Sequence, residues 1–135
     1  MEDEIKVLYF YPHRNPEYRV IPNTLEAKQK LVRGLIEAVY PWDDPVALVC
    51  NEEGKINGME LNRVIEDEDG NPVEVIAGPF FICGIGEEDF ESIGEELGKK
   101  YYDLFFDWDV FFRDSKGHIC YRHRLDFEGK PKQIT

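Results

Sequence analysis

Turn signals containing glycine divide this sequence into short apolar runs, and their spacing constrains the fold more than any other feature. Asn57-Gly58 and Asp69-Gly70 match the two-residue hairpin signal, since both central residues of a type I′ turn need a positive φ angle. Asp114-Ser115-Lys116-Gly117 places a glycine where a bulged hairpin needs a left-handed residue. Turns this close together leave room only for short strands, so the pattern predicts an antiparallel meander.

The runs between these turns are rich in β-branched and aromatic residues, which favour extended backbone. Residues 80–83 are apolar throughout, as in a central strand that is covered on both faces. One strand is expected to carry Asn62 and Arg63 between the two Asx-Gly turns. The other predicted strands are residues 5–11, 18–21, 35–40, 46–50, 73–77, 80–83, 110–113 and 118–125.

Two capping patterns predict where helices begin. In Asn23-Thr24-Leu25-Glu26, the first and last residues have the spacing of a capping box. This helix is expected to reach about Arg33, with Gly34 as its left-handed stop. Ser92-Ile93-Gly94-Glu95 repeats the pattern before a second helix over residues 93–106. The apolar stripe of the first helix would consist of Leu25, Leu31, Val32 and Leu35.

The order of these elements predicts an α+β fold, with two helices packed on a mostly antiparallel sheet of about six short strands. A chain of 135 residues fits one domain with a single main core. We expect the domain to span residues 1–125, with residues 110–125 forming a C-terminal hairpin added to it. Residues 126–135 are expected to form a flexible tail.

The acidic residues are concentrated in the middle of the chain. The formal net charge is -12, but residues 41–109 carry -15 and residues 110–135 carry +3. An acidic surface repels phosphate backbones, so nucleic-acid binding that depends on clustered lysine and arginine is disfavoured. Only the C-terminal end has the charge to attract an anion.

The ends and the cysteines bear on location. Met1-Glu2-Asp3-Glu4 is acidic where a secretory signal would be basic, and the apolar runs are too short to cross a bilayer. Cys50, Cys83 and Cys120 are an odd number without a C-x-x-C pair, and each has apolar or aromatic neighbours. We therefore expect free, buried thiols and a cytoplasmic protein without a membrane partner.

A series of short motifs runs through the first two thirds of the chain. They are Asn23-Thr24-Leu25-Glu26-Ala27, Gln29-Lys30-Leu31-Val32, Asn51-Glu52-Glu53-Gly54-Lys55, Asn57-Gly58, Asn62-Arg63, Ile76-Ala77-Gly78 and Glu88-Asp89-Phe90. Taken in this order, from about Thr24 to Phe90, the chain resembles the bacterial and phage family known as domain of unknown function 3846. The resemblance implies a compact α+β domain in a phage or mobile element, and it brings no catalytic residues.

Arginines at two places could bind a small anion. The planar guanidinium of Arg63 offers a fork of donors to a carboxylate or phosphate. The alternative is that Arg63 pairs with Glu74 across the predicted hairpin. An anion- or nucleotide-binding site would comprise Asn62, Arg63, Arg113, Arg122 and Arg124.

The predicted C-terminal strand has two chemically different faces. Arg122 and Arg124 lie on one face and Tyr121 and His123 on the other, which gives a basic edge with aromatic neighbours. A charged edge strand blocks aggregation. The alternative is that this hairpin forms a homo-oligomer by meeting the acidic middle of another copy.

Metal-binding and catalytic patterns are weak. Strand alternation places His118 and Cys120 on one side and His123 on the other, so one metal ion could not easily collect all three. Asp103, Asp107 and Asp109 offer carboxylates without an adjacent histidine, and the sequence has no G-x-S-x-G elbow and no glycine-rich phosphate loop before a helix. The sequence therefore predicts no metal site, no cofactor and a non-enzymatic role.

The first functional hypothesis is an accessory protein of a phage or mobile element that binds a host or phage protein through its acidic surface. Concentrated negative charge costs stability through self-repulsion and so invites a functional reason, with DNA mimicry or solubility as alternatives. The second hypothesis is a small-anion or nucleotide binder, and an enzyme is the third. The expected partner-binding residues are Glu66, Asp67, Glu68, Asp69, Glu87, Glu88, Asp89 and Glu91.

Overall fold

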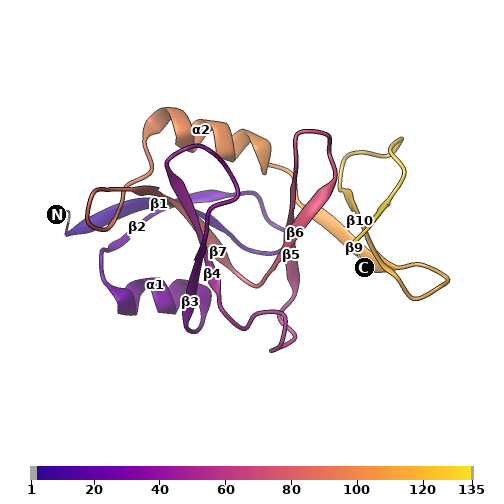
Figure 1. Cartoon of the computed structure of the whole chain (residues 1–135), viewed down its shortest axis with the longest axis horizontal. Coiled ribbons are helices and arrows are strands. Elements are labelled where there is room, and N and C mark those ends of the chain that lie inside the picture. Colours follow the sequence, from indigo (N-terminus) through magenta and orange to yellow (C-terminus); the bar gives the residue numbers. More distant parts are fainter. Residues whose placement is uncertain (1–2, 135) are drawn as a thin grey trace.

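The computed structural model describes residues 3–134, and strands dominate it (Figure 1). The helices are α1 (Leu25–Val32) and α2 (Glu95–Leu104). The strands are β1 (Glu4–Phe10), β2 (Glu17–Pro22), β3 (Ile36–Val39), β4 (Val46–Asn51), β5 (Leu61–Glu66), β6 (Pro72–Ala77), β7 (Phe80–Ile85), β8 (Phe90–Glu91), β9 (Asp109–Arg113), β10 (Ile119–His123) and β11 (Lys132–Gln133).

The strands form one large and two small antiparallel sheets. The six-stranded sheet has the order β2-β1-β7-β4-β3, with β8 added to β7. The β5-β6 hairpin and the β11-β10-β9 sheet are separate. Two helices with mainly antiparallel sheets confirm the predicted α+β class, and β7 is the central strand that its uniform apolar sequence indicates.

The six-stranded sheet is covered on both faces, and Figure 1 shows α1 and α2 on opposite sides of it. Alternation along β1 sends Val7 to one face and Leu8 to the other, and both are fully buried. The α1 face buries a cluster that includes Val7, Val32 and Phe81. The α2 face buries a larger cluster that also takes in Ile65 of the β5-β6 hairpin and Tyr101 of α2. The hairpin is therefore packed on the α2 side of the sheet.

Helix α1 begins and ends one residue away from the predicted positions. The N-cap is Thr24, whose Oγ1 accepts a hydrogen bond of 3.1 Å from the Ala27 backbone N–H, while Asn23 instead accepts one from Lys28. At the other end, Arg33 takes the left-handed conformation with φ 62°. Gly34 follows because a Cβ there would lie 2.6 Å from the Asn51 side chain, which donates to the last carbonyls of α1. In the predicted stripe, Leu25 and Leu35 are exposed.

Helix α2 begins two residues later than its capping pattern predicts. Ser92 is not the cap, because its Oγ accepts a 2.9 Å hydrogen bond from the Lys6 backbone N–H. Gly94 is the N-cap residue and supplies no side-chain hydrogen bond. A contact with strand β1, which is distant in sequence, thus occupies the side chain that the local pattern predicts as the helix cap.

The two Asx-Gly turns lie at loops, but neither has the predicted type I′ geometry. Only the glycines have positive φ, 71° at Gly58 and 81° at Gly70. The Gly70 turn is wider than two residues, since Gly70 donates back to the Asp67 carbonyl over 3.0 Å. Gly117 has φ 83° and fits the left-handed position expected of it in the β9-β10 hairpin.

The C-terminal segment contains a strand where a loose tail is expected. Strand β11 pairs with Cys120 and Tyr121 of β10, and Lys132 donates a hydrogen bond to Glu66 over 3.1 Å. Strand β10 is therefore the middle of its sheet and not an edge, which removes the basic edge that the sequence predicts.

The cysteines agree with the sequence prediction, since Cys50, Cys83 and Cys120 are all free and buried. Between residues 3 and 134, neither helix has the length and apolar character needed to cross a bilayer.

Candidate functional site

Arg63, the leading candidate for anion binding, is a fully buried residue with internal partners. Its guanidinium donates to the carbonyl oxygens of Phe105 and Arg14, at 3.2 and 2.6 Å, and to the Asn62 side chain at 2.8 Å. It also lies over the ring of Phe10. Burial lowers the pKa of Arg63 to about 10, against the influence of Asp109, so it remains charged at neutral pH. Arg63 joins the end of α2 to the β1–β2 loop.

Glu74, the alternative partner predicted for Arg63, pairs with a different residue. Glu74 lies opposite Ile65 in the β5-β6 register and is paired with Lys55, at 2.5 Å. Asn62 is fully buried as well, and its amide donates to the carbonyls of Phe10 and Gly78. The Asn62-Arg63 pair thus fastens three segments of backbone together.

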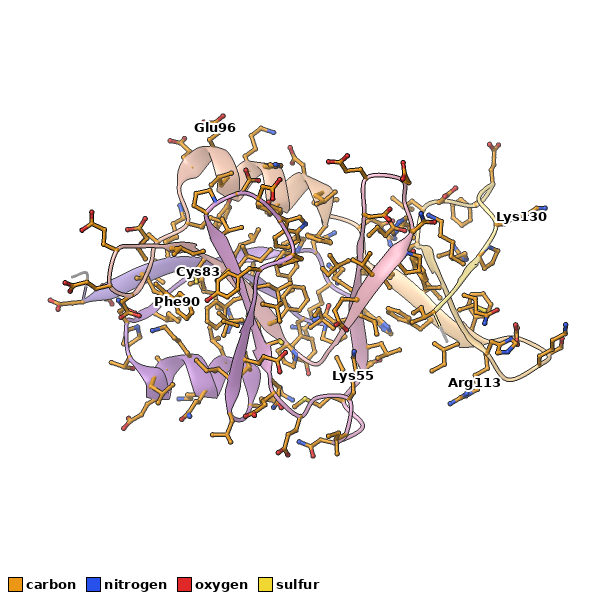
Figure 2. The ribbon with its side chains drawn as sticks, viewed as in Figure 1. Lys55, Cys83, Phe90, Glu96, Arg113 and Lys130 are labelled. Atoms are coloured by element: carbon orange, nitrogen blue, oxygen red, sulfur yellow. The ribbon has the colours of Figure 1, made fainter. Side chains whose placement is uncertain are left out.

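The C-terminal arginines do not join Arg63 in one site. Arg113 extends from the outer end of the C-terminal sheet, where Figure 2 labels it, and donates to the Gly117 carbonyl. Arg122 donates to the Arg124 carbonyl at 2.8 Å. The guanidinium of Arg124 pairs with Asp107 at 2.7 Å and lies 3.9 Å over Trp108. Within residues 3–134, no hydrogen bond or ion pair links these arginines to Arg63.

The two acidic segments predicted to bind a partner lie far apart. Figure 1 places the β5–β6 turn beside the C-terminal sheet and the β7–β8 turn near the N-terminus. The β7–β8 turn surrounds an open depression of about 560 Å³. Its lining includes Glu87, Glu88, Asp89 and Glu91. One partner surface of modest size cannot contact both segments, so they are separate candidates.

The β5–β6 turn borders a larger feature, which we call the acidic groove. It consists of two adjoining pockets of about 400 and 210 Å³ that share Trp42, Glu66 and Asp67. The first pocket is also lined by Pro41, Asp43, Asp44, Glu68 and Lys100. The second is also lined by Val64, Leu104, Phe105, Asp107, Asp109 and His123.

An aromatic stack supports the groove from below. The Trp42 ring lies 4.5 Å from Tyr101 and 6.0 Å from Phe105, measured between ring centroids. Phe105 in turn packs edge-on against Phe10 of the main core. Trp42 packs against the core but is only partly buried, so it presents an aromatic surface to both pockets.

The inner pocket is closed by a charged network around His123. One ring nitrogen of His123 contacts Asp109, a buried carboxylate, and the other lies 3.1 Å from Glu66. The hydrogen bond with Asp109 raises the pKa of His123 to about 9, although partial burial opposes it, so both ring nitrogens carry protons at neutral pH. Glu66 also accepts hydrogen bonds from Tyr121 and Lys132.

The same network lowers the pKa of Glu66. Burial alone would raise the pKa of Glu66, but hydrogen bonds from Tyr121 and Lys132 and the adjacent His123 outweigh burial and lower it. Tyr121 has its pKa raised by burial and by its hydrogen bond to this carboxylate. Asp109 also accepts a 2.8 Å hydrogen bond from the Val64 backbone N–H. The network fastens the C-terminal sheet to β5.

The network around His123 fits a role in stabilising the fold better than a role in proton transfer. A general base needs a free ring nitrogen that can take up a proton, and both nitrogens of His123 already face carboxylates. His118 and Cys120 lie apart from it and contact Asp114. In the part of the chain that the structure describes, no group of three or more histidine, cysteine or acidic side chains is arranged to hold a metal ion.

The carboxylates of the groove fall into two groups. Asp44 is paired with Lys100 and Asp107 with Arg124, in addition to the network around His123. Asp43, Asp67 and Glu68 have no ion pair with any residue from 3 to 134, although Asp67 accepts hydrogen bonds from the backbone N–H groups of Asp69 and Asn71. The unpaired charge of the groove therefore lies in the first pocket, which Trp42 also lines.

The sequence predicts only some of the residues that line this groove. Glu66, Asp67 and Glu68 belong to a predicted partner-binding segment, whereas residues 41–45 are recognisable only as a proline-bounded turn. A tryptophan followed by two aspartates, with a proline on each side of the three residues, is the sequence signal of this part of the groove. The contribution of His123 depends on a contact across the fold and has no local signature.

Comparison with known proteins gives a family. A family model described as Domain of unknown function (DUF3846) matches residues 5–106. This segment contains both helices, the six-stranded sheet and the β5-β6 hairpin, and it ends before β9. Neither the curated proteins nor the solved structures gave a match. The C-terminal sheet, which supplies His123 to the groove, lies outside the matched segment.

Proposed function

This chain belongs to the family described as domain of unknown function 3846, and we propose that it acts without catalysis by binding a basic segment of a partner protein in the acidic groove. The single observation that carries the proposal is that Asp43 and Glu68, two exposed carboxylates without an ion pair among residues 3–134, line the same pocket as the partly exposed ring of Trp42. This arrangement offers charge and an aromatic face to the same cation.

The chemistry favours a lysine or arginine side chain as the group that is bound. A cation over the face of a tryptophan is attracted by the ring quadrupole, and a nearby carboxylate adds a direct Coulomb attraction. The aromatic stack beneath Trp42 holds the ring in place before binding, so little ordering cost remains. These exposed carboxylates would mainly speed association by steering a basic partner.

Other expectations from the sequence are separate from this proposal. A phage or mobile-element setting and a host partner remain predictions. The acidic β7–β8 turn remains an alternative contact, and its distance from the groove allows the two to be tested against each other.

A peptide-binding experiment tests the proposal. Trp108→Phe leaves Trp42 as the only tryptophan, so its fluorescence reports on the groove. We expect a lysine- and arginine-rich peptide to bind, and an acidic peptide of equal length not to bind. In this background, Asp43→Lys with Glu68→Lys should weaken binding at least about tenfold, equivalent to about 1.4 kcal/mol.

The matched control is Glu87→Lys with Glu88→Lys, which changes the net charge equally at the β7–β8 turn. This control should retain most of the affinity, and the association rate should fall with salt because exposed charges are screened. Equal weakening in both variants would show general attraction to an acidic protein. That result, or no binding of the basic peptide, contradicts the proposal.

A further inference from the structure

A second concavity, which we call the basic pocket, lies on the α1 face of the six-stranded sheet. It has a volume of about 520 Å³ and is formed by the β1-β2 hairpin and α1. Its floor is apolar and includes Ile21, Ala27 and Leu31. Its remaining lining is cationic and aromatic, with Arg14, Arg19, Lys30 and Arg33 near Tyr9 and Tyr11. A pocket of this size and lining fits a small molecule.

The arginines of the basic pocket are held in place by the tyrosine rings. The Arg19 guanidinium lies 4.1 Å from the ring centroid of Tyr9. Arg14 and Arg33 lie 4.9 and 5.4 Å from the ring centroid of Tyr11. Cation–π stacking uses the face of a guanidinium and leaves its edge N–H groups available to a ligand.

Most of this positive charge is not neutralised. Arg19 is paired with Glu17 at 2.6 Å. Within residues 3–134, no carboxylate forms an ion pair with Arg14, Lys30 or Arg33. The chain as a whole carries a net charge of -12, so three unpaired cations around one concavity are unusual for this protein. Positive charge concentrated in a pocket attracts an anion.

The hydroxyl of Tyr9 adds a polar group to the basic pocket. Tyr9 is only 6% exposed and lines the basic pocket, yet its hydroxyl has no hydrogen-bond partner among residues 3–134. Burial raises the pKa of Tyr9 despite the nearby guanidinium of Arg19, so the hydroxyl keeps its proton and can donate. Among the described residues, no buried side-chain nitrogen or oxygen lacks a partner, so the Tyr9 hydroxyl is open to the pocket and accessible to a ligand.

We propose that the basic pocket binds a small phosphate-bearing molecule with a planar ring, of the mononucleotide class. The guanidinium groups of Arg14 and Arg33 suit the oxygen atoms of a phosphate, which they can contact through parallel N–H donors. The apolar floor and the tyrosine rings suit a flat base rather than a bare ion. The sequence pointed to anion binding at Arg63 and the C-terminal arginines, and the pocket lies elsewhere.

A mononucleotide fits better than a nucleic-acid strand. The basic pocket is a single concavity, and a strand would have to continue across a chain that is strongly acidic overall. Binding along a strand needs a track of lysine and arginine, which screens and replaces its counterions.

Calorimetric titration with four probes tests this proposal: adenosine 5′-monophosphate, adenosine, inorganic phosphate and a short single-stranded oligonucleotide. We expect adenosine 5′-monophosphate to bind at least about tenfold more tightly than adenosine or inorganic phosphate, because the phosphate and the ring each contribute. Arg14→Gln with Arg33→Gln should reduce that affinity at least about tenfold. Both side chains are exposed, so the melting temperature should remain nearly unchanged.

The matched control is Arg113→Gln with Lys116→Gln, which removes the same charge from the C-terminal sheet and should leave binding unchanged. Equal loss of affinity in the control would reduce the effect to net charge and overturn the proposal. Tighter binding of the oligonucleotide than of the mononucleotide overturns the ligand class. Binding of adenosine as tight as that of its phosphate would overturn the role of the arginines.

Discussion

At the scale of single residues, the role predicted for Arg63 from the sequence differs from its role in the structure. In the sequence it is an arginine in a strand next to asparagine, a pattern that suits an anion site or a surface ion pair equally well. In the structure it is fully buried, and its hydrogen bonds go to neutral oxygens of Asn62, Phe105 and Arg14. Local pattern does not encode burial, so the sequence could nominate Arg63 but could not assign its role.

Replacement of Arg63 should therefore act on stability. Arg63→Met leaves the carbonyls of Phe105 and Arg14 without this donor in a buried place, which should lower the free energy of unfolding by about 3 kcal/mol. Arg113→Met, at an exposed position, should change it by less than about 0.5 kcal/mol. Urea denaturation of both variants provides the measurement. Equal stability of Arg63→Met and the unsubstituted protein would contradict the structural role.

At the scale of elements, every predicted strand and both helices are present, because alternation and turn residues act over short distances. The caps were wrong where a distant strand competes for the same side chain, as at Ser92, which bonds to Lys6. The residues of the acidic groove were predicted only in part, because some of them come together through contacts between distant segments. Glu66 to Glu68 are recognisable locally, whereas Trp42 and His123 reach the groove only through packing.

The His123 network should make the attachment of the C-terminal sheet depend on pH. The pKa of His123 rises from its usual 6.5 to about 9 in the folded state, so its stabilising contribution is complete below pH 6.5 and is lost as pH rises through about 9. We expect the melting temperature to fall between those values. His123→Gln should remove this dependence, and His118→Gln, a matched histidine outside the network, should retain it. A flat profile in the unsubstituted protein would rule out the network as a source of stability.

At the scale of the whole molecule, the C-terminal sheet lies outside the two buried apolar clusters of the protein. The two buried clusters draw on the six-stranded sheet, both helices and the β5-β6 hairpin, and they contain no residue of β9, β10 or β11. The C-terminal sheet is attached mainly through β5 and the network around His123. Parts with few buried apolar contacts open at lower free energy than the core.

The three free thiols provide a test of this difference. Cys50 and Cys83 lie in the six-stranded sheet, and burial raises their pKa values to about 11 and about 12, so both are protected and poorly reactive. Cys120 lies in the C-terminal sheet. In mild urea, we expect mass spectrometry to show labelling of Cys120 before the other two. Simultaneous labelling of all three would show that the molecule opens as one cooperative unit.

The position of Arg63 has a consequence for how the two candidate sites relate. One guanidinium holds the carbonyl of Arg14, which borders the basic pocket, and the carbonyl of Phe105, which borders the acidic groove. A ligand that shifts either segment must therefore alter the same hydrogen bonds. If a ligand in one site changes the affinity of the other by some factor, thermodynamic linkage requires the reverse effect to be equal. The two faces of the sheet would then report on each other's occupancy.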